Sequence, residues 1–566
     1  MSRWRVAQPA EEQVAELASA LRLRPLTARV LLARGLSRVD DIARFLAPRL
    51  GDLRPPVGIA DLDRAAERIE TALSSGQRIG VFGDYDVDGV TTAAVLSSSL
   101  RQLGADVVPR VASRFSGYGL PPAEIVRFAE SGCGLIITGD CGTSDHEALA
   151  VARERGIDVI VIDHHQVPEG PCGAYALINP HRHDDQFAFK GLASCGVAFY
   201  LMAALRTRLR GRQHAAASTF DPRTLLDLVA LGTIADLVPL TAENRILVAA
   251  GLREITQRRR PGLRALARIA EIDPARPITA IEVGFRLTPR LNAPGRLGEA
   301  QAALELLLAA DDAEATQRAE AVDGINRERQ RIQEEVWQAA IAAAEAQRDA
   351  SAIVVGEEGW HPGVVGIVAA KLVERFGKPA AAIAFTKGVG RGSLRTVGGF
   401  HLQAALVRCA EHLQAHGGHA GAAGMTISRE CFEAFRAAFV AAASVHQQSS
   451  DLPAALEADA GAELTDLDLP QLEELARLAP FGKDNGEPTL AFSDLQVRSS
   501  RVVGQNHLQL VVSKGDAVMD GIGFGMAAQA PPDGSAIDAL ACAEIDNYRG
   551  YQRPRLRFRR ILAAGS

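Results

Sequence analysis

Cysteine and aromatic residues are scarce in this sequence. Its 566 residues include seven cysteines, an odd number with no CxxC pair, and only 5% aromatic residues. These counts support neither a disulfide framework nor a cysteine-based zinc site. The cysteine content fits a protein of the reducing cytoplasm.

Long apolar runs and a net positive charge are also missing. No run reaches the roughly 18 charge-free apolar residues of a membrane-spanning helix, and the N-terminal MSRWRVAQPAEEQ has no apolar signal core. We therefore expect neither membrane insertion nor secretion by that route. The net charge of −6 argues against a generic basic DNA-coating protein, although local basic patches remain compatible with it.

The length allows about three or four domains. Four short apolar runs, RIGVFGD, ADVVPRV, GLIITGD and DVIVID, alternate with helical stretches, which predicts an α/β fold with a parallel sheet flanked by helices. A long polar stretch then predicts a helix that bridges two domains, because such helices have no wide apolar face. The predicted units are an N-terminal helical segment, an α/β metal domain, a connecting helix, a smaller α/β domain and a C-terminal β-barrel, over residues 1–50, 51–310, 311–349, 350–447 and 448–566.

The strongest chemical signal is GDYDVDG, which places Asp84, Asp86 and Asp88 on alternate residues after an apolar strand. Three such carboxylates repel one another unless a cation is bound. A calcium EF-hand loop is the obvious competitor. We reject it because its twelfth position would be Val95, which has no ligand atom, and because a strand rather than a helix precedes the loop.

Two further predicted strands end in similar residues. GLIITGD ends in Asp140, and DVIVID leads into Asp163, His164 and His165; Asp236 stands in an apolar stretch. Ligands of open α/β sheets bind at the carboxyl ends of the strands, so these side chains are expected at one rim. Each aspartate alone fits a turn or helix cap, but the whole set predicts a metal site.

An Asp/His site without cysteine suits a pair of Mn²⁺ or Mg²⁺ ions, with zinc or iron left open. Two such ions are suited to the hydrolysis of phosphate esters.

GDYDVDG, DCG, DHH and GTIAD, in this order, resemble the DHH phosphoesterase superfamily. Further motifs resemble the bacterial RecJ type of single-strand-specific DNA exonuclease: FRLTPRLNAPGRL (285–297), HGGHAGAAG (416–424), FGKDNGEP (481–488) and NYRG (547–550). The resemblance covers nearly the whole chain. It implies a DHH metal domain, a smaller DHHA1 domain and an oligonucleotide-binding (OB-like) barrel.

The resemblance also implies roles for the rim residues. His165 would lie near the scissile phosphate, and Asp140 and Asp163 would share the catalytic centre with it. Asp84 and Asp163 fit partial ligation or the orientation of a ligand such as His164 equally well. The implied metal-ligand set is Asp84, Asp86, Asp88, Asp140, His164 and Asp236.

The implied substrate contacts lie in four motifs. RFSGYGL, one residue shorter than the family pattern, contains Arg114 and Tyr118, and LNAPG is expected to form a Pro-Gly turn between two arginines. An ordinary loop, an ion pair or a tight turn would explain each motif taken alone. The other residues implied to bind substrate are Arg290, Asn292, Arg296, Ser393, Arg395, Gly417, Gly418 and His419. In the barrel, the basic end from Arg553 to Arg560 with Phe558 suits a path for single-stranded DNA, or else a solvated strand face.

We therefore expect a single-stranded-DNA-specific 5′→3′ exonuclease with a two-metal mechanism, acting in DNA recombination and repair in the cytoplasm. It is expected to be a monomer, with a helicase and a single-strand-binding protein as candidate partners. One alternative is a DHH phosphodiesterase for short oligonucleotides or cyclic dinucleotides, which the barrel and FGKDNGEP argue against. A non-catalytic DNA-binding scaffold is the other, although every ligand position is filled.

Overall fold

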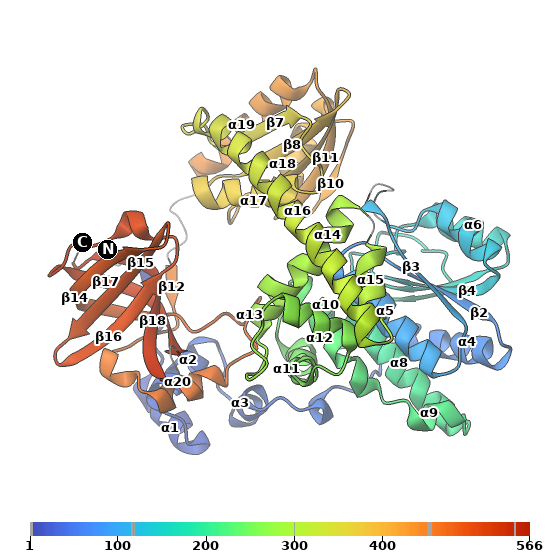
Figure 1. The fold of residues 1–566 in the computed structure, drawn as a ribbon, viewed down its shortest axis with the longest axis horizontal. Helices are drawn as coiled ribbons and strands as arrows, with labels where there is room; N and C mark the ends of the chain where they lie inside the picture. The colour runs from blue at the N-terminus through green and yellow to red at the C-terminus, as the bar shows by residue number, and fades with distance from the viewer. Residues whose placement is uncertain are drawn as a thin grey trace.

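Three larger β-sheets organise the molecule, each in its own lobe (Figure 1). The structure is a computed structural model, and it describes residues 4–114, 117, 119–298, 300–449, 456–547 and 551–565. The predicted arrangement of a parallel-sheet domain, a connecting helix, a smaller α/β domain and a barrel is confirmed.

The first sheet is entirely parallel, with the strand order β3-β2-β4-β5-β6. Four of its strands coincide with the four apolar runs of the sequence; the short fifth strand was not predicted. The strands are largely apolar because helices cover both faces of the sheet. Their bounds are β2 Arg78–Gly83, β3 Val107–Val111, β4 Cys133–Gly139, β5 Asp158–Ile162 and β6 Ala176–Ile178.

Helices α4, α5 and α8 pack on one face of this sheet, and α6 and α7 pack on the other. Their bounds are α4 Leu62–Ser74, α5 Val87–Gln102, α6 Pro122–Glu130, α7 His146–Glu154 and α8 Ser194–Gly211.

A helical layer completes this domain. It contains α9 Ala215–Thr219, α10 Leu226–Ala235, α11 Ala242–Gln257, α12 Pro261–Ile269, α13 Ala280–Glu282, α14 Thr288–Leu297 and α15 Gln301–Leu307, with a π-helical turn at Val283–Leu287. The expected Pro-Gly turn at LNAPG is wrong, since Pro294 and Gly295 lie inside α14.

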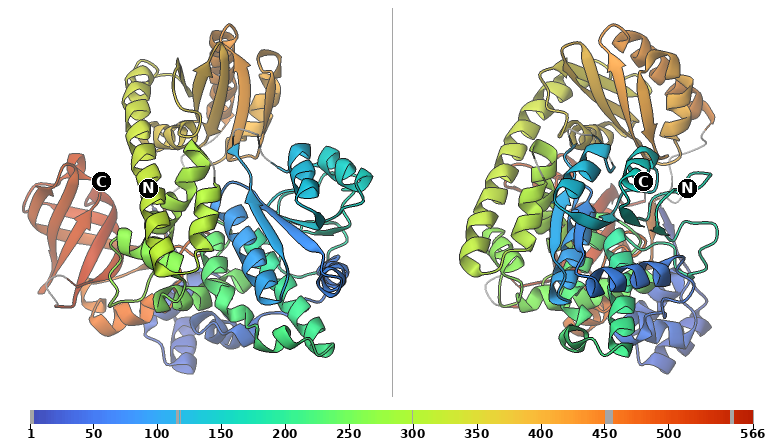
Figure 2. Two further views of the ribbon diagram at one scale, coloured as in Figure 1. Left: turned by 45° about the vertical axis from the view of Figure 1, so that its right-hand side comes forward. Right: turned by 90° about the vertical axis from the view of Figure 1, so that its right-hand side faces the viewer.

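The connecting helix α16 (Asp312–Glu345) runs for 34 residues, about 50 Å at 1.5 Å per residue (Figure 2). It is unbroken at Gly324. Its N-terminal half packs on α12, α14 and α15, and its C-terminal half packs on α17 and β7. The helix is therefore not polar all round but buries one side along each domain.

The second α/β domain has the strand order β10-β11-β9-β8-β7, in which only β7 and β8 are parallel. Its helices cover both faces of the sheet. The elements are β7 Ile353–Glu358, α17 Val365–Phe376, β8 Ala380–Thr386, β9 Val389–Arg395, α18 Leu402–Arg408, β10 Ala415–Gly418, β11 Ala422–Ser428 and α19 Phe432–Ser449.

The C-terminal strands form a closed barrel because β14 pairs with both β15 and β17. Phe558 is buried in its core, so its ring does not contribute to the path for single-stranded DNA that was expected at this basic end. The arginines beside it form ion pairs with Glu487, Glu544 and neighbouring aspartates. The strands are β13 Ala460–Gly461, β14 Leu490–Val503, β15 His507–Lys514, β16 Ala517–Gly523, β17 Ala536–Asp546 and β18 Arg553–Ala563.

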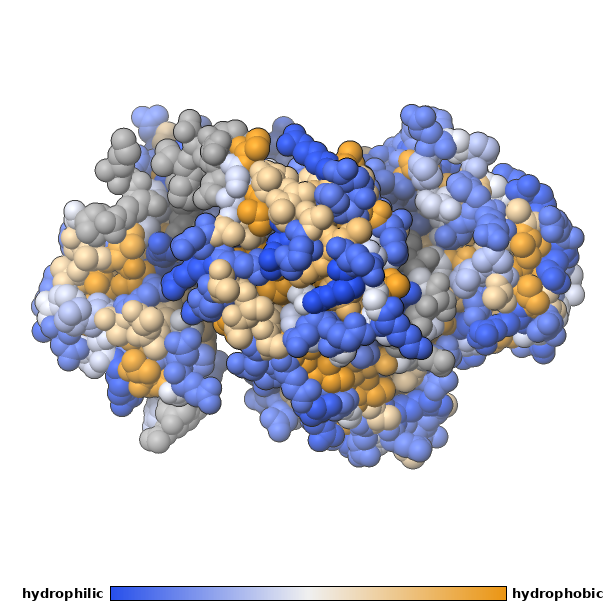
Figure 3. Space-filling view, turned by 90° about the horizontal axis from the view of Figure 1, so that it is seen from above, coloured by the Kyte–Doolittle hydropathy of each residue, from blue (hydrophilic) through white to orange (hydrophobic). Residues whose placement is uncertain are grey.

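The N-terminal helices pack against the barrel, although more than four hundred residues separate them in the chain. Strand β1 (Trp4–Val6) also pairs in parallel with β12 (Leu456–Ala458), so both ends of the chain lie together (Figure 1). Seen from above, a notch separates the barrel on the left from the middle of the molecule (Figure 3). The helices of this unit are α1 Glu11–Leu21, α2 Pro25–Ala33, α3 Val39–Leu46 and α20 Leu469–Ala476.

No helix among the described residues is both long and apolar enough to cross a membrane.

Arg245 on α11 joins the barrel unit to the metal domain. Its side chain is buried, and burial together with the nearby Arg34 lowers the pKa of this guanidinium to about 10. The N–H groups of its guanidinium donate hydrogen bonds to the backbone carbonyl oxygens of Phe45, Arg477, Leu478 and Ala479.

We predict that Arg245→Ala lowers stability by about 3 kcal/mol, because buried carbonyls lose a charged donor. The measurement is the midpoint of thermal unfolding, together with the rate of proteolytic release of the N-terminal helices. Gln257→Ala, at an exposed position of the same helix, is the control and should leave both unchanged. If the two variants have the same unfolding midpoint and the same proteolysis rate, Arg245 does not join the barrel unit to the metal domain.

Candidate active site

The metal loop follows β2 directly. Asp86 is the N-cap of α5, and its carboxylate accepts a hydrogen bond from the Gly89 backbone N–H at 3.1 Å. Any side chain at Gly89 would overlap the backbone of Asp84, so this turn requires glycine. The tight turn brings three aspartates to the end of the strand.

The neighbouring strands end at the same rim. Gly83 is aligned with Gly139, and Gly139 with Ile162, so the residues after β2, β4 and β5 meet. Asp140 follows β4 with a φ of 66°, a left-handed conformation that aspartate tolerates better than most residues. Strain of this kind is concentrated at functional sites.

Asp236 reaches the rim from α10. Gly232 of this helix packs so closely on α5 that a side chain there would overlap Thr91 and approach Asp88. The close packing of α10 on α5 therefore places the carboxylate of Asp236, the residue after α10, at the rim.

Three overlapping groups of side chains can hold metal ions. In each group the ligand atoms lie within 4.8 Å of one another. The groups are Asp84, Asp86 and Asp140; Asp88, His164 and Asp236; and Asp140, His164 and His165. All six residues expected as metal ligands are in these groups, and Asp140 is common to two of them.

Unsatisfied buried atoms support a bound cation. Asp84 Oδ1 and His164 Nε2 are buried without a hydrogen-bond partner in the described part of the chain. His164 Nε2 lies 3.3 Å from Asp140 Oδ1 and 3.5 Å from Asp236 Oδ2. Buried polar atoms normally have a partner, so this donor set fits divalent ions such as Mn²⁺ or Mg²⁺.

The carboxylates repel one another strongly. Burial and the charge of Asp86 raise the pKa of Asp84, and burial with the charges of Asp86 and Asp88 raises that of Asp140. Burial and the same two charges raise the pKa of Asp236 to about 8. Burial lowers the pKa of His164, which keeps its imidazole neutral and able to bind metal.

The second α/β domain closes over this rim around a cavity of about 490 Å³. Arg114, Arg296 and Arg391 line it, and none of the three forms an ion pair with a carboxylate of the described residues. The Arg114 guanidinium lies 4.2 Å from the centre of the Tyr85 ring, which also lines the cavity. Because Tyr85 belongs to the metal loop, the cavity adjoins the metal groups.

The cavity is strongly cationic. Burial and repulsion from Arg114, Arg329 and Arg395 lower the pKa of Arg296 to about 10, so its guanidinium stays charged at neutral pH. Such an arrangement is suited to a phosphate, which accepts several charged hydrogen bonds at once.

Comparisons with known proteins agree with this geometry. Residues 78–233 match the DHH family, N-terminal domain, residues 349–444 the DHHA1 domain, and residues 458–560 the RecJ OB domain. The chain is 35% identical over 565 residues to the single-stranded-DNA-specific exonuclease RecJ of Bacillus subtilis, covering 98% of this chain and 70% of that protein. It is 37% identical over 545 residues to the same enzyme of Dickeya dadantii, covering 93% and 94%.

The chain belongs to the RecJ family. The crystal structure of RecJ in complex with Mn²⁺ from Thermus thermophilus superposes with a TM-score of 0.83 at 32% identity, covering 100% of this chain and 80% of that one.

In this RecJ-family chain, Asp163 orients His165 rather than His164. One carboxylate oxygen of Asp163 lies 2.8 Å from His165 Nδ1 and also accepts from both histidine backbone N–H groups, while the other accepts from Thr143. The expectation that Asp163 orients the ring of His164 is therefore wrong. Burial by itself would lower the pKa of His165 and raise that of Asp163. The His165–Asp163 hydrogen bond outweighs burial, so the pKa of His165 rises to about 9 and that of Asp163 falls to about 2.

The expected substrate residues fall into two sets. Arg114, Arg296, Ser393 and Gly417 line the cationic cavity, and Arg395 lies beside Ser393. Arg290 instead pairs with Asp323 on α16, and Asn292, Gly418 and His419 are not among the lining residues. The prediction for Tyr118 lies outside the described residues.

Sequence reasoning missed several residues that the structure places here. Arg391 alternates with Ser393 and Arg395 along β9, so the two-residue period of a strand would have shown it. Ser194 had no such signal. Its backbone N–H donates to Asp88 at 2.7 Å, and its hydroxyl donates to Asp140 at 3.0 Å.

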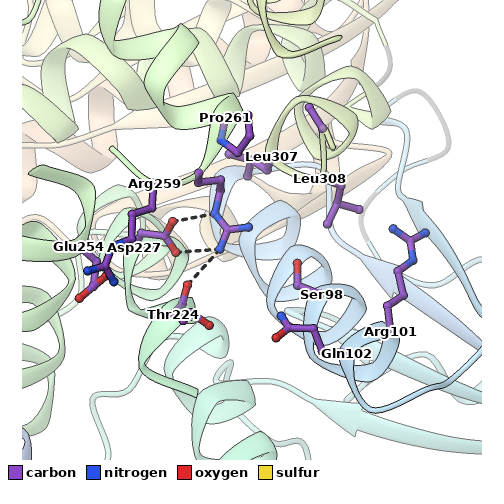
Figure 4. Close-up of a pocket in the computed structure, with 12 residues that line it drawn as sticks. Ser98, Arg101, Gln102, Thr224, Asp227, Glu254, Arg259, Pro261, Leu307 and Leu308 are labelled. Atoms are coloured by element: carbon purple, nitrogen blue, oxygen red, sulfur yellow. Dashed lines mark hydrogen bonds and ion pairs between the residues drawn. The ribbon is translucent and has the colours of Figure 1, made fainter. Parts of the chain in front are cut away.

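A second cavity of about 360 Å³ lies at the opposite end of α5 (Figure 4). Ser98, Arg101 and Gln102 reach it from the last turns of the helix. Asp227, which lines it, forms a bidentate ion pair with Arg260. Because its charges are largely paired and the metal loop is at the other end of α5, we do not assign it to the active site.

We predict that Mn²⁺ binding releases more protons at pH 7 than at pH 9. Asp236, with its pKa near 8, is protonated at the lower pH and must lose this proton to bind metal. The folded metal-free protein holds this proton more tightly than the unfolded chain, so stability should fall as pH rises from about 4 through 8.

Calorimetry in two buffers of different ionisation enthalpy measures the protons released, and thermal melts measure the stability. Asp236→Asn is the matched variant and should release fewer protons at pH 7. Proton release that is independent of pH would contradict the assignment.

Proposed function

We propose that this chain is a metal-dependent exonuclease that hydrolyses single-stranded DNA from its 5′ end, in DNA recombination and repair. The observation that carries the proposal is that an Asp/His cluster adjoins a cationic cavity through the Asp84–Asp86 loop, and that no carboxylate of the described residues lines this cavity. Full-length similarity to single-stranded-DNA-specific exonucleases of the RecJ family supports it. The 5′→3′ polarity rests on the family resemblance.

The proposed metal ligands are the six residues named above, with two Mn²⁺ or Mg²⁺ ions as cofactors. The Thermus thermophilus relative has been crystallised with Mn²⁺ and with Mg²⁺, which supports both choices. When bound, two such ions supply Lewis acidity to the phosphate and activate water for in-line attack.

His165 is the proposed proton donor. Its pKa of about 9 keeps the imidazole protonated at neutral pH, and Asp163 holds the ring beside the ligand groups. A charged imidazole there stabilises the negative charge of the transition state or protonates the leaving oxygen. Asp163 positions the ring and Asp140 holds metal.

The cationic cavity is the proposed site of the terminal phosphate. Ser393 and Arg395 on β9, with Arg114 and Arg296 from the metal domain, would grip it from both sides. A cavity of about 490 Å³ is of small-ligand size. We therefore propose that a base-paired end is excluded by shape.

The alternatives are less well supported. A phosphodiesterase for short oligonucleotides needs no barrel, and a non-catalytic scaffold needs no complete ligand set.

A monomer in the cytoplasm, assisted by a helicase and a single-strand-binding protein, remains our prediction. We also retain the five proposed units, with residues 1–50 and 448–566 acting together because they share a core.

The first test is a time course with Mn²⁺ on 5′-phosphorylated, 3′-labelled DNA, with a single strand and its blunt duplex compared. We expect stepwise shortening of the single strand only. Asp140→Ala should reduce this by more than roughly 100-fold, beyond the loss of an outer-sphere partner, while strand binding persists. Asp106→Ala, at the opposite end of the sheet, is the control. Turnover by Asp140→Ala at the wild-type rate would refute the metal assignment.

Arg395→Ala tests the terminal-phosphate site. The variant should lose roughly 10- to 100-fold in kcat/KM on 5′-phosphorylated strands, the value of one charged hydrogen bond, and much less on 5′-hydroxyl strands. Arg408→Ala, at an exposed position of the same domain, should behave as wild type. Equal losses on both substrates would remove Arg395 from this role.

A further inference from the structure

The rim of the first sheet has a fourth strand end, which belongs to β6. The last residue of this strand, Ile178, is aligned with Ile162 at the end of β5. Asn179 therefore follows β6 as Asp163 follows β5, and the Asp163 backbone N–H donates to the Ile178 carbonyl at 3.1 Å. Since parallel strands end at a common edge, Asn179 lies at the rim beside the DHH motif.

The side chain of Asn179 is fully buried, with 0% of it exposed. Its Nδ2 donates to the His165 backbone carbonyl at 2.9 Å and makes a longer contact of 3.4 Å with Thr143 Oγ1. Its Oδ1 accepts from the His181 backbone N–H at 2.9 Å. A carbonyl only accepts and a backbone N–H only donates, so these partners determine which way the amide points.

Thr143 connects Asn179 to the carboxylate that orients the ring of His165. The Thr143 side chain is 2% exposed, and its hydroxyl donates to Asp163 Oδ2 at 2.6 Å. A hydroxyl has one hydrogen, so the Thr143 oxygen is left to accept from Asn179. The other oxygen of Asp163 lies 2.8 Å from His165 Nδ1. Asn179 thus contacts the main chain of His165 directly and its ring through two intermediates.

The turn after β6 does not by itself require asparagine. The bond from His181 N–H to Asn179 Oδ1 forms an Asx turn, which aspartate makes equally well and serine more weakly. The Nδ2 donor is used in another direction, toward His165. A carboxylate at this position would face the His165 carbonyl without a hydrogen to share and would add negative charge to an acidic rim. Asparagine closes the turn and donates to His165 without that charge.

The turn that carries Asn179 is itself held firmly. The Arg182 backbone N–H donates to the Asn179 carbonyl at 3.2 Å. The Arg182 guanidinium donates to the Leu177 carbonyl and to the Asp61 carboxylate, which also accepts the Leu177 N–H at 3.0 Å. A side chain that orients a catalytic group must have a fixed support of its own, and Asn179 has one.

We propose that Asn179 is a positioning residue for His165, which holds the imidazole in place beside the metal groups by fixing the His165 carbonyl and the Thr143–Asp163 pair. This inference rests on the proposed function, in which His165 is the proton donor. Asn179 acts through His165 rather than on the substrate itself.

The test measures release of the first nucleotide from a 5′-phosphorylated single strand, with Mn²⁺ and saturating protein in a single turnover. Asn179→Asp keeps the turn but loses the donor, and Asn179→Ser does so without adding charge. Both variants should slow this step by roughly 10- to 100-fold, because a misplacement of about 1 Å can cost about 100-fold. The Kd for the strand and the affinity for Mn²⁺, measured by calorimetry, should equal those of the wild type.

Asn485→Asp is the matched control. Asn485 is buried in the barrel unit, and its Nδ2 donates to the carbonyls of Leu478 and Pro480. The control variant loses a buried amide donor of the same kind, so its midpoint of thermal unfolding should fall as that of Asn179→Asp does. Its single-turnover rate should stay that of the wild type.

A double-mutant cycle separates positioning from general structural support. His165→Ala removes the group that Asn179 is proposed to position, so adding Asn179→Asp to this variant should cause no further loss of rate. A general acid contributes about 100- to 10,000-fold, which leaves the slow cleavage by His165→Ala measurable in long incubations. Structural damage by Asn179→Asp would instead slow both backgrounds by the same factor.

The outcomes distinguish the two proposals. If the wild-type protein does not shorten the single strand, the proposed function fails and the role of Asn179 fails with it. If the wild type shortens the strand and both Asn179 variants match it, or if the loss persists without the His165 ring, only the positioning role is overturned. Weaker Mn²⁺ binding at an unchanged rate would also overturn it and would assign Asn179 to the support of the metal ligand His164.

Discussion

Repulsion among buried carboxylates is the constraint on which the active site depends. Five aspartates, Asp84, Asp86, Asp88, Asp140 and Asp236, converge at one edge of a sheet in which apolar strands and helices exclude water. Without cations this arrangement opposes folding, which is why the pKa of Asp236 rises to about 8. The fold tolerates it because two extensive cores, one on each face of the sheet, hold the strand ends in place.

The N-terminus of α8 relieves part of this repulsion. Both oxygens of Asp88 accept backbone N–H groups, from Ser194 at 2.7 Å and from Cys195 at 3.1 Å. The positive end of a helix favours the ionised carboxylate. The same turn holds Asp140 through the Ser194 hydroxyl. The first turn of α8 thus fixes the carboxylates of Asp88 and Asp140, which follow different strands of the sheet. Little rearrangement of these two side chains is therefore required when ions bind.

The sequence was informative where chemistry follows from position along a strand. Aspartates and histidines at strand ends had to meet because parallel strands end at a common edge. Contacts between distant segments could not be predicted in this way. Nothing local marks Ser194 as a partner of Asp88, and nothing in α1 or α2 indicates that they pack on a barrel that begins more than four hundred residues later.

Two errors have a specific physical cause. A Pro-Gly pair normally ends a helix, yet LNAPG is helical because Gly295 packs directly on the Tyr85 carbonyl, where no side chain fits. Tertiary packing of the metal loop here outweighs local propensity. Arg290 was expected to bind phosphate, but its guanidinium forms an ion pair with Asp323 on the connecting helix. No pattern within the motif indicates this partner.

The connecting helix adds a buried positive charge near the cationic cavity. Asn326 and Arg329 are buried on α16, and the Arg329 Nε has no hydrogen-bond partner among the described residues. Arg329 adds to the charge that lowers the pKa of Arg296, so the cationic cavity is unfavourable without an anion, and the metal rim is unfavourable without cations. The two regions offset each other only in part: the charge of Arg114 lowers the pKa of Asp84 and that of Asp86 raises the pKa of Arg296, but burial outweighs both. A phosphodiester with its metal ions satisfies both at once, and stability sacrificed in the ligand-free protein thereby becomes binding energy for the substrate.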